Sequence, residues 1–409
     1  MNSAISRLLR LEDPVLHEGR LGLLCNHVAF DADTGSYLHE LLADRGTLKR
    51  VFVPEHGLFA ELQDQEPLPD AGVYAQKGKD IEFVSLYAGT EDSLRVSPAQ
   101  LQDLDALVIA LQDVGSRYYT FVVTLSYVLD QLARTNSGIS VYVIDYENPA
   151  GRWVEGTPLP ADYTSFIGRA GMLHRHGMTV AELCRYFQSE SGCKWKLEIV
   201  PLDEPAVERM RADRPLMPVP PSPNMPLVET GRVYAGQCLL EGINVSEGRG
   251  TTRPFEIFGA PWMVQGKANS IPDQLKKTEG AVLRQLRFRP TFHKYTNEIC
   301  EGYQIHLTGK PFHSLAFSLQ MIRWIRENWS DRFEFLPGAY EHLSERTAIE
   351  LLAGDPLMLG YLKGDISFTP VTQTMMEAES AWIQKMQSFQ LYDVPFRQAP
   401  CDQNLLPSE

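Results

Sequence analysis

Five short β-rich runs in the first half of the chain constrain the fold most strongly, because some of them are apolar on both faces. They lie at residues 21–25, 50–53, 82–86, 106–111 and 141–144, and they include the sequences ALVIAL and VYVI. A strand that is apolar on both faces must be covered by helices on both sides, as it is in a parallel sheet.

Segments with helix-compatible spacing alternate with these runs. They lie at residues 36–43, 98–104, 122–133 and 179–189. Ser97-Pro98 suits the start of a helix, and Thr179 is followed three residues later by Glu182, which predicts a capping box. The alternation predicts an α/β fold with a Rossmann-like, mostly parallel sheet.

The pattern changes at about residue 245. Residues 287–295 and 303–307 are predicted strands, and residues 314–328 and 373–386 are predicted amphipathic helices. We therefore expect a Rossmann-like domain over residues 1–244 and a second, smaller α+β C-terminal domain over residues 245–409 that contributes to the active-site cleft. Residues 215–226 hold six prolines, which suit either a stiff linker or a rigid wall beside a pocket.

The charge of the chain excludes some partners. Its net charge of −14 and its pI of about 5.3 disfavour nucleic acid and anionic membranes as partners, because both attract clustered Lys and Arg.

The six cysteines of the chain show neither a disulfide framework nor the spacing of a zinc site. The N-terminus has no apolar core of a secretory signal, so we expect a cytoplasmic protein, or a periplasmic or secreted one if a signal has been removed.

Polar side chains follow four of the predicted strands. Asn26, Glu55 with His56, Asp113 and Asp145 each come at or just after a strand end. Because ligands bind beyond the carboxyl ends of parallel strands, these groups are expected to converge on one rim.

Each of these groups also has an ordinary structural interpretation. Glu55 could be a solvated loop residue, Asp145 could cap the next segment, and aromatic residues such as Tyr118 could pack in the core instead of stacking on a sugar. His174 and His176 resemble a metal-ligand pair, but no carboxylate lies near them in sequence, so no metal is predicted.

Several catalytic motifs are absent from the sequence. It has no dinucleotide-binding G-x-G-x-x-G after the first strand, no phosphate loop and no G-x-S-x-G nucleophile elbow. The remaining carboxylates, one well-placed imidazole and several Arg and Asn residues suit acid–base hydrolysis of a polar substrate, above all a glycoside, without a cofactor.

Five motifs resemble those of the NamZ-like family of exo-acting β-N-acetylmuramidases, long catalogued as a domain of unknown function. They are PEHG (54–57), QDVGSRYYT (112–120), RHGMT (175–179), PPSPNMP (220–226) and LLEGINVSEGRGTTRPFEIFGAPW (239–262). The resemblance implies a Rossmann-like catalytic domain and a smaller C-terminal domain. It also implies release of N-acetylmuramic acid from the non-reducing end of peptidoglycan fragments, so the expected partner is a peptidoglycan-derived disaccharide or glycan chain end. Many relatives are exported, whereas this chain shows no signal.

The resemblance also implies roles for individual residues. Glu55 matches the family's catalytic acid, and His56 is a second active-site residue. Asn224 lies in PPSPNMP, and the longest motif contains Glu241, Glu247, Arg249 and Arg253.

The substrate's chemistry adds further expectations. N-acetylmuramic acid carries a lactyl carboxylate, for which Arg offers a bidentate fork. The predicted substrate-binding residues are Asn26, Asp113, Arg117, Tyr118, Asn224, Arg249 and Arg253.

The second catalytic group stays open among Glu241, Glu247 and Asp113, as do retention, inversion and attack by the substrate's acetamido group. Two other functions also stay open. One is a non-catalytic muropeptide-binding protein. The other is a metal-dependent amidase or deacetylase that uses His56, His174 and His176.

Overall fold

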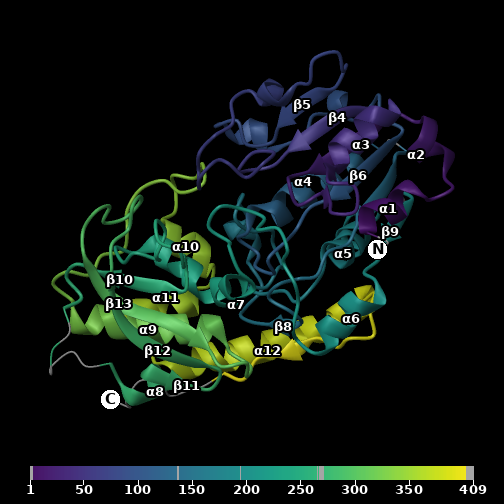
Figure 1. The fold of residues 1–409 in the computed structure, drawn as a ribbon. Coiled ribbons are helices and arrows are strands. Elements are labelled where there is room, and N and C mark those ends of the chain that lie inside the picture. Colours follow the sequence, from purple (N-terminus) through teal and green to yellow (C-terminus); the bar gives the residue numbers. More distant parts are fainter. Residues whose placement is uncertain (1–2, 136–137, 194, 265, 267–270, 402–409) are drawn as a thin grey trace.

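A six-stranded parallel sheet forms the first half of the molecule (Figure 1). The computed structural model describes residues 3–401 except 136–137, 194, 265 and 267–270. The strand order is β5 (Glu82–Ser85), β4 (Leu48–Val53), β1 (Leu21–Cys25), β6 (Ala106–Ala110), β7 (Ser140–Ile144) and β9 (Leu197–Val200). Every pairing in this sheet is parallel, which confirms the predicted Rossmann-like α/β architecture.

Both faces of this sheet are covered, as the doubly apolar runs require. In β6, Leu107 and Ile109 belong to the hydrophobic cluster of α4 (Thr120–Thr135) and α5 (Val180–Ser191). Val108 and Ala110 belong to the opposite cluster, with α1 (Ala4–Leu9) and α3 (Leu38–Arg45). Alternate residues of one strand thus stabilise two helical layers.

A second, antiparallel sheet lies in the C-terminal half. Its strand order is β10 (Ile257–Ala260), β13 (Cys300–Leu307), β12 (Ala281–Phe288) and β11 (Lys277–Thr278). The helices of this half are α7 (Val228–Gln237), α8 (Asp273–Lys276), α9 (Ser314–Asn328), α10 (Ala348–Ala353), α11 (Pro356–Lys363) and α12 (Phe368–Met386). The cluster that contains α4 and α5 continues through α7 and α9, so the two halves share one hydrophobic core.

The remaining elements are short. They are α2 (Pro14–Glu18), β2 (Phe30–Asp31), β3 (Ser36–Tyr37), β8 (Trp153–Val154), α6 (Glu204–Arg211) and β14 (Arg397–Gln398), with 3-10 turns η1 (Ala71–Tyr74), η2 (Glu91–Leu94), η3 (Pro98–Gln100), η4 (Ala161–Tyr163), η5 (Cys238–Gly242) and η7 (Gln387–Phe389). Among the described residues, no helix has both the length and the apolar character needed to cross a membrane.

Two predicted elements are wrong. The helix expected at residues 98–104 is only the 3-10 turn η3, because the carbonyl of Gln100 accepts a hydrogen bond from the Arg50 guanidinium (2.6 Å) and the N–H of Leu104 bonds to Leu101 instead. The strand expected at residues 287–295 overlaps β12 only at its first two positions, because Pro290 cannot donate to a sheet.

The predicted division at residue 244 stays a prediction, and residues 1–2 and 402–409 of the expected domains lie outside the described residues. The helices expected at residues 314–328 and 373–386 are confirmed as α9 and as most of α12.

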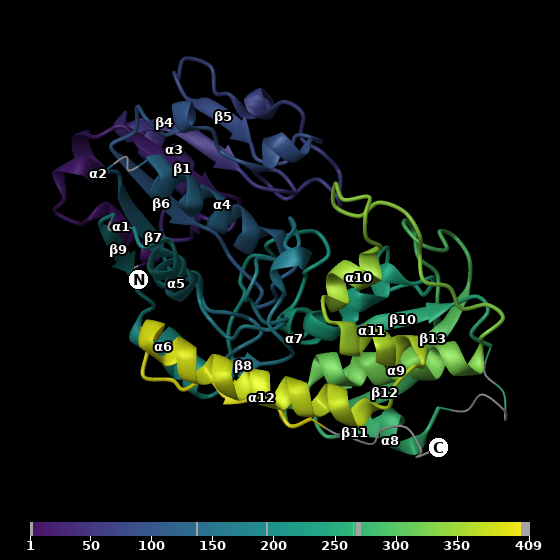
Figure 2. The ribbon, with the colours of Figure 1, turned by 180° about the vertical axis from the view of Figure 1, so that it is seen from behind.

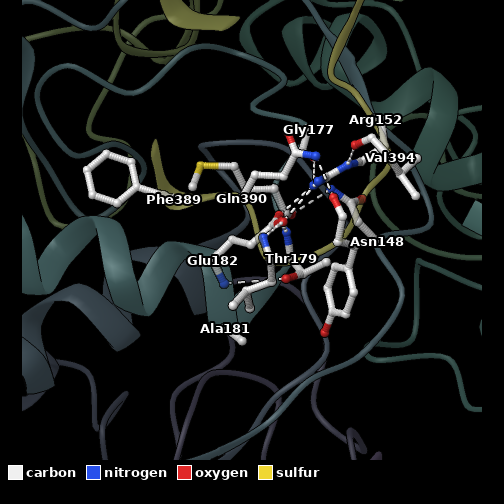
Figure 3. Close-up of polar contacts among 12 residues, drawn as sticks. Asn148, Arg152, Gly177, Thr179, Ala181, Glu182, Phe389, Gln390 and Val394 are labelled. Carbon is white, nitrogen blue, oxygen red and sulfur yellow. Dashed lines mark hydrogen bonds and ion pairs between the residues drawn. The ribbon is translucent and has the colours of Figure 1, made fainter. Parts of the chain in front are cut away.

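Residues 391–398 return to the first half, where a buried ion pair holds them (Figure 3). β14 pairs with β8, and the adjacent Arg152 donates to both carboxylate oxygens of Glu182, at 2.5 and 2.9 Å. Arg152 also donates to the carbonyl of Val394, and Glu182 accepts from the backbone of Leu391. Glu182 accepts from the N–H of Thr179 as well, which confirms the predicted capping box. Figure 2 shows α12 running along this side, from the second sheet toward α6.

Candidate active site

A narrow cavity lies beyond the carboxyl end of β4, where loops of both halves meet. Its described lining residues are Glu55, His56, Asp64, Tyr118, Tyr119, Thr120, Ile167, Ser222, Asn224, Met225, Tyr234, Glu241, Arg249, Phe255, Tyr340 and Glu341. In Figures 1 and 2, the yellow-green loop between α9 and α10 lies against the blue loops that follow β4 and β5. The cavity measures ≈ 30 Å³, so a sugar can enter only when the lining side chains or loops move apart.

The PEHG turn directs its side chains into this cavity. β4 ends at Val53, and His56 and Gly57 then adopt left-handed backbone conformations, with φ of 73° and 85°. A Cβ atom at Gly57 would lie 2.7 Å from the Tyr74 hydroxyl, so glycine is required there. The ring nitrogen Nδ1 of His56 lies 3.1 Å from the carbonyl of Leu62 and fixes the imidazole beside the turn.

Glu55 is held by hydrogen bonds from the first half of the molecule. Its carboxylate accepts hydrogen bonds from the Thr120 hydroxyl (2.6 Å) and from the backbone N–H of Gln65 (3.2 Å). Thr120 is the first residue of α4, so the side chain sits at the positive end of that helix. Only 2% of Glu55 is exposed.

Glu55, Asp64 and Glu341 form a carboxylate cluster in which one oxygen of each residue lies within 4.8 Å of one oxygen of each of the others. Glu341 comes from the loop between α9 and α10, and it accepts a hydrogen bond from the Tyr87 hydroxyl (2.9 Å). Burial raises the pKa of Glu341 well above its usual range, and the charges of Glu55 and Asp64 raise it further, while the Tyr87 hydrogen bond opposes the shift.

Three carboxylates at this spacing suit an oxygen-preferring cation such as Mg²⁺ or Ca²⁺. A group of acidic side chains alone does not identify a metal site, and we assign none. The cluster instead brings together a buried carboxyl group, whose pKa is raised, and the carboxylates that raise it, an arrangement typical of acid–base sites.

Arg249 joins the carboxylate cluster to two further glutamates. Its guanidinium lies 2.6 Å from Glu241, 3.2 Å from Asp64 and 3.3 Å from Glu247. Burial raises the pKa of Glu241, Arg249 opposes this, and the charges of Asp64 and Glu247 add to it. Glu241 also accepts a hydrogen bond from the Tyr340 hydroxyl, from the same loop as Glu341.

Glu247 lies behind Arg249 and is fully buried. Its carboxylate lies 3.0 Å from Lys294 and 2.9 Å from His293. Burial alone would raise the pKa of Glu247, but Lys294, His293 and Arg249 together hold it below its usual range. Glu247 therefore contacts Arg249 from behind, while Glu241 lines the cavity itself.

Four of the predicted binding residues are absent from the cavity lining. Asn26 donates to the carbonyl of Pro221 (3.0 Å) and so supports the proline-rich segment. Asp113 accepts from the N–H of Gly115 (2.7 Å) and shapes its own turn. Arg117 is buried and donates to the carbonyls of Thr157, Leu352 and Ala353, whereas Arg253 is half-exposed beside Glu256.

The other three predicted binding residues, Tyr118, Asn224 and Arg249, do line the cavity. Tyr118 donates its hydroxyl to the carbonyl of Ala235, and Asn224 donates to Gln63 (3.0 Å). Ser222 and Met225 flank Asn224 on the lining, as expected if residues 215–226 form a wall beside a pocket.

The two histidines that flank Arg175, His174 and His176, lie in the core. His174 contacts the carbonyl of Ala353 (2.9 Å), and His176 lies 3.1 Å from Asp113. Both are fully buried, and neither lines the cavity with His56. Asp145 accepts from the N–H of Ala181 in α5, so it does cap the next helix.

Asp64, Thr120, Tyr340 and Glu341 contribute to the site but were not predicted. The sequence offered one signal, a second Glu-His pair at Glu341 and His342. Both members of that pair have left-handed backbone conformations, with φ of 46° and 68°, as His56 does.

Comparisons with known proteins match almost the whole chain. Residues 21–229 match the family model described as "Exo-beta-N-acetylmuramidase NamZ, N-terminal", and residues 232–392 match its C-terminal counterpart. The peptidoglycan beta-N-acetylmuramidase NamZ of Bacillus subtilis (strain 168) is 34% identical over 343 residues, which is 81% of this chain and 80% of that protein.

Two solved structures of DUF1343 family proteins from Bacteroides fragilis NCTC 9343 share the fold. The first has a TM-score of 0.77 at 21% identity and covers 96% of this chain and 98% of its own. The second has a TM-score of 0.70 at 22% identity and covers 95% and 98%. At this identity the likeness concerns the fold alone.

Proposed function

Because the chain belongs to the exo-β-N-acetylmuramidase NamZ family, we propose that it is a glycoside hydrolase that releases N-acetylmuramic acid from the non-reducing end of peptidoglycan fragments. The observation that carries this proposal is the carboxylate cluster of Glu55, Asp64 and Glu341 in a cavity beyond a strand end. Glycoside hydrolysis uses a pair of carboxyl groups in different protonation states.

The substrate is a disaccharide or the end of a glycan chain. Most of the residues that line the cavity are buried, which suits a terminal sugar better than an internal one, since an internal sugar needs a groove open at both ends. The rings of Tyr118, Tyr119 and Phe255 offer apolar faces to the sugar.

Arg249 is the proposed partner of the lactyl carboxylate. Among the three arginines expected for this role, Arg249 lines the cavity, whereas Arg117 and Arg253 make their contacts elsewhere. Its guanidinium is balanced by Glu241, Glu247 and Asp64, which fix its position before the substrate arrives.

Glu55 and His56 are the residues of the PEHG turn proposed to act directly on the substrate. Glu55 faces the scissile bond as a catalytic carboxyl group, and His56 hydrogen-bonds the sugar. Glu241 is a further cavity carboxyl, whereas Glu247, which lies behind Arg249, is proposed to support that arginine instead of contacting the sugar.

A cytoplasmic location is also proposed. Cys25, Cys184, Cys193, Cys238 and Cys300 are free thiols, as is typical of proteins in a reducing compartment. Fractionation of cells that express the protein at native level would test it, and recovery outside the cytoplasm would contradict it.

The test of function uses the 4-nitrophenyl glycoside of N-acetylmuramic acid. We expect the wild-type protein to release nitrophenol and Glu55→Gln to lose at least about 100-fold in kcat/KM. Glu66→Gln is the matched control, because Glu66 lies in the same loop with an exposed side chain. Saturable binding of the glycoside by wild type without turnover would instead indicate a muropeptide-binding protein.

A further inference from the structure

The loop between α9 and α10 brings a carboxyl group of the second half of the molecule against Glu55. Glu341 is 6% exposed and lies in the carboxylate cluster with Glu55 and Asp64. Its loop is tied to the first half by the hydrogen bond from Tyr87 and by the Tyr87 ring, whose centroid lies 5.6 Å from that of His342. Two left-handed residues in succession hold this conformation, a backbone arrangement that proteins retain mostly at functional sites.

The contacts of the two glutamates differ in kind. Both oxygens of Glu55 accept hydrogen bonds, from Thr120 and from the backbone of Gln65, so the structure satisfies Glu55 as a carboxylate. Glu341 accepts a hydrogen bond from Tyr87, and it faces the carboxylates of Glu55, Asp64 and, farther away, Glu241. A proton in this cluster is therefore best placed on Glu341.

We propose that Glu341 is the general acid of the hydrolysis and that Glu55 is the carboxylate paired with it. This role rests on the proposed function. Glu341 donates its proton to the glycosidic oxygen as the C1–O bond breaks, and the bonding electron pair stays on that oxygen. Glu55 stabilises the positive charge that develops at C1. Water then adds its hydroxyl to C1 and returns its other proton to Glu341, so one water is consumed for each bond cleaved.

The spacing of the pair agrees with this assignment. An enzyme that inverts configuration places a water between carboxyl groups about 6.5–9.5 Å apart, whereas retaining enzymes keep them about 5–5.5 Å apart. The short separation of Glu55 and Glu341 leaves no room for such a water. The resemblance to the family suggested Glu55 as the acid, and this inference assigns the proton to its partner instead.

Leaving-group dependence separates a general acid from a structural residue. We compare kcat/KM of Glu341→Gln on the N-acetylmuramic acid–N-acetylglucosamine disaccharide and on the 4-nitrophenyl glycoside. The sugar alkoxide must be protonated as it leaves, whereas nitrophenolate leaves unaided. We expect a loss of about 10²–10⁴-fold on the disaccharide and of less than about 10-fold on the aryl glycoside. Equal losses on both, or no loss on the disaccharide, would overturn the assignment.

Tyr87→Phe provides a second test that does not depend on the folding of Glu341→Gln. The Tyr87 hydrogen bond lowers the pKa of Glu341, so its removal should move the alkaline limb of the kcat/KM profile to higher pH. Besides Glu55 and Asp64, the other titratable or charged groups that line the cavity are His56, Tyr118, Tyr119, Tyr234, Glu241, Arg249 and Tyr340. An alkaline limb that stays in place or moves to lower pH would overturn the role of Glu341 while leaving the proposed hydrolase activity intact. A wild-type protein that cleaves neither compound would overturn both.

Discussion

The substitution Glu55→Gln should leave the protein at least as stable as wild type, although it removes a buried charge. One carboxylate oxygen of Glu55 lies within 4.8 Å of one of Asp64. Two unit charges at that distance repel by about 3 kcal/mol at an effective dielectric constant of about 20. Glutamine removes this repulsion and keeps the shape of the side chain.

The stability that the same substitution loses through its hydrogen bonds is smaller than the repulsion that it removes. Glutamine can still accept the hydrogen bond from Thr120, but its amide then faces the N–H of Gln65, which loses an acceptor. One such loss costs about 1 kcal/mol, and the pairing of Asp64 with Arg249 already offsets part of the repulsion. The net change in the free energy of unfolding is therefore about 0 to +2 kcal/mol.

Thermal unfolding measures this change in stability directly, with Glu182→Gln as the comparison variant. For a chain of 409 residues, an unfolding entropy of about 2.1 cal/mol/K per residue converts 1 kcal/mol into about 1 °C. Glu55→Gln should thus unfold between the wild-type midpoint and about 2 °C above it. Glu182→Gln, the same chemical change beside the buried Arg152, should lose about 3–5 kcal/mol and unfold about 3–6 °C lower. A fall for Glu55→Gln as large as that for Glu182→Gln would refute the repulsive carboxylate cluster.

Two further predictions concern specificity and acid stability. Arg249→Lys keeps the charge but loses the bidentate fork. The ratio of kcat/KM for the aryl glycoside of N-acetylmuramic acid to that for the aryl glycoside of N-acetylglucosamine should therefore fall about 10-fold or more. An unchanged ratio would exclude Arg249 from lactyl recognition. Glu155 is buried between Arg175 and His313. Burial alone would raise the pKa of Glu155, but those two cations lower it to about 2. The stabilisation is present above pH 4.5, the ordinary pKa of Glu, and is lost as the pH falls toward 2; it amounts to about 3 kcal/mol. Urea unfolding should therefore show a steep loss of wild-type stability across that window and a flatter one for Glu155→Gln, and parallel curves would contradict the pairing.

The parallel sheet could be predicted because its strands are buried on both faces. Runs such as ALVIAL and VYVI, which have no polar residue, favoured strands covered by helices on both sides. The sixth strand, β9, was missed because three of its four residues are only half-buried at the edge of the sheet, so its sequence LEIV carries no doubly apolar signal. Helix propensity also gave a wrong prediction at residues 98–104. There the Arg50 guanidinium donates to the carbonyl of Gln100, which a helix would use for its own backbone hydrogen bond.

The candidate site was predictable only in part. Strand-end position identified Glu55 and His56, but the same reasoning selected Asn26 and Asp113, whose side chains satisfy buried backbone groups nearby. A position at the rim of a sheet does not say which way a side chain points. Glu341 comes from a loop of the second half, and its approach to Glu55 depends on how the two halves pack, which no local spacing encodes.

The most direct test of the proposed function offers the protein two disaccharides that differ in one substituent. One is N-acetylmuramic acid linked β-1,4 to N-acetylglucosamine, and the other is the plain N-acetylglucosamine disaccharide, which lacks the lactyl group. Release of N-acetylmuramic acid from the first, with no cleavage of the second, is the predicted result. Cleavage of both at similar rates would contradict recognition of the lactyl carboxylate, and cleavage of neither would contradict the hydrolase itself.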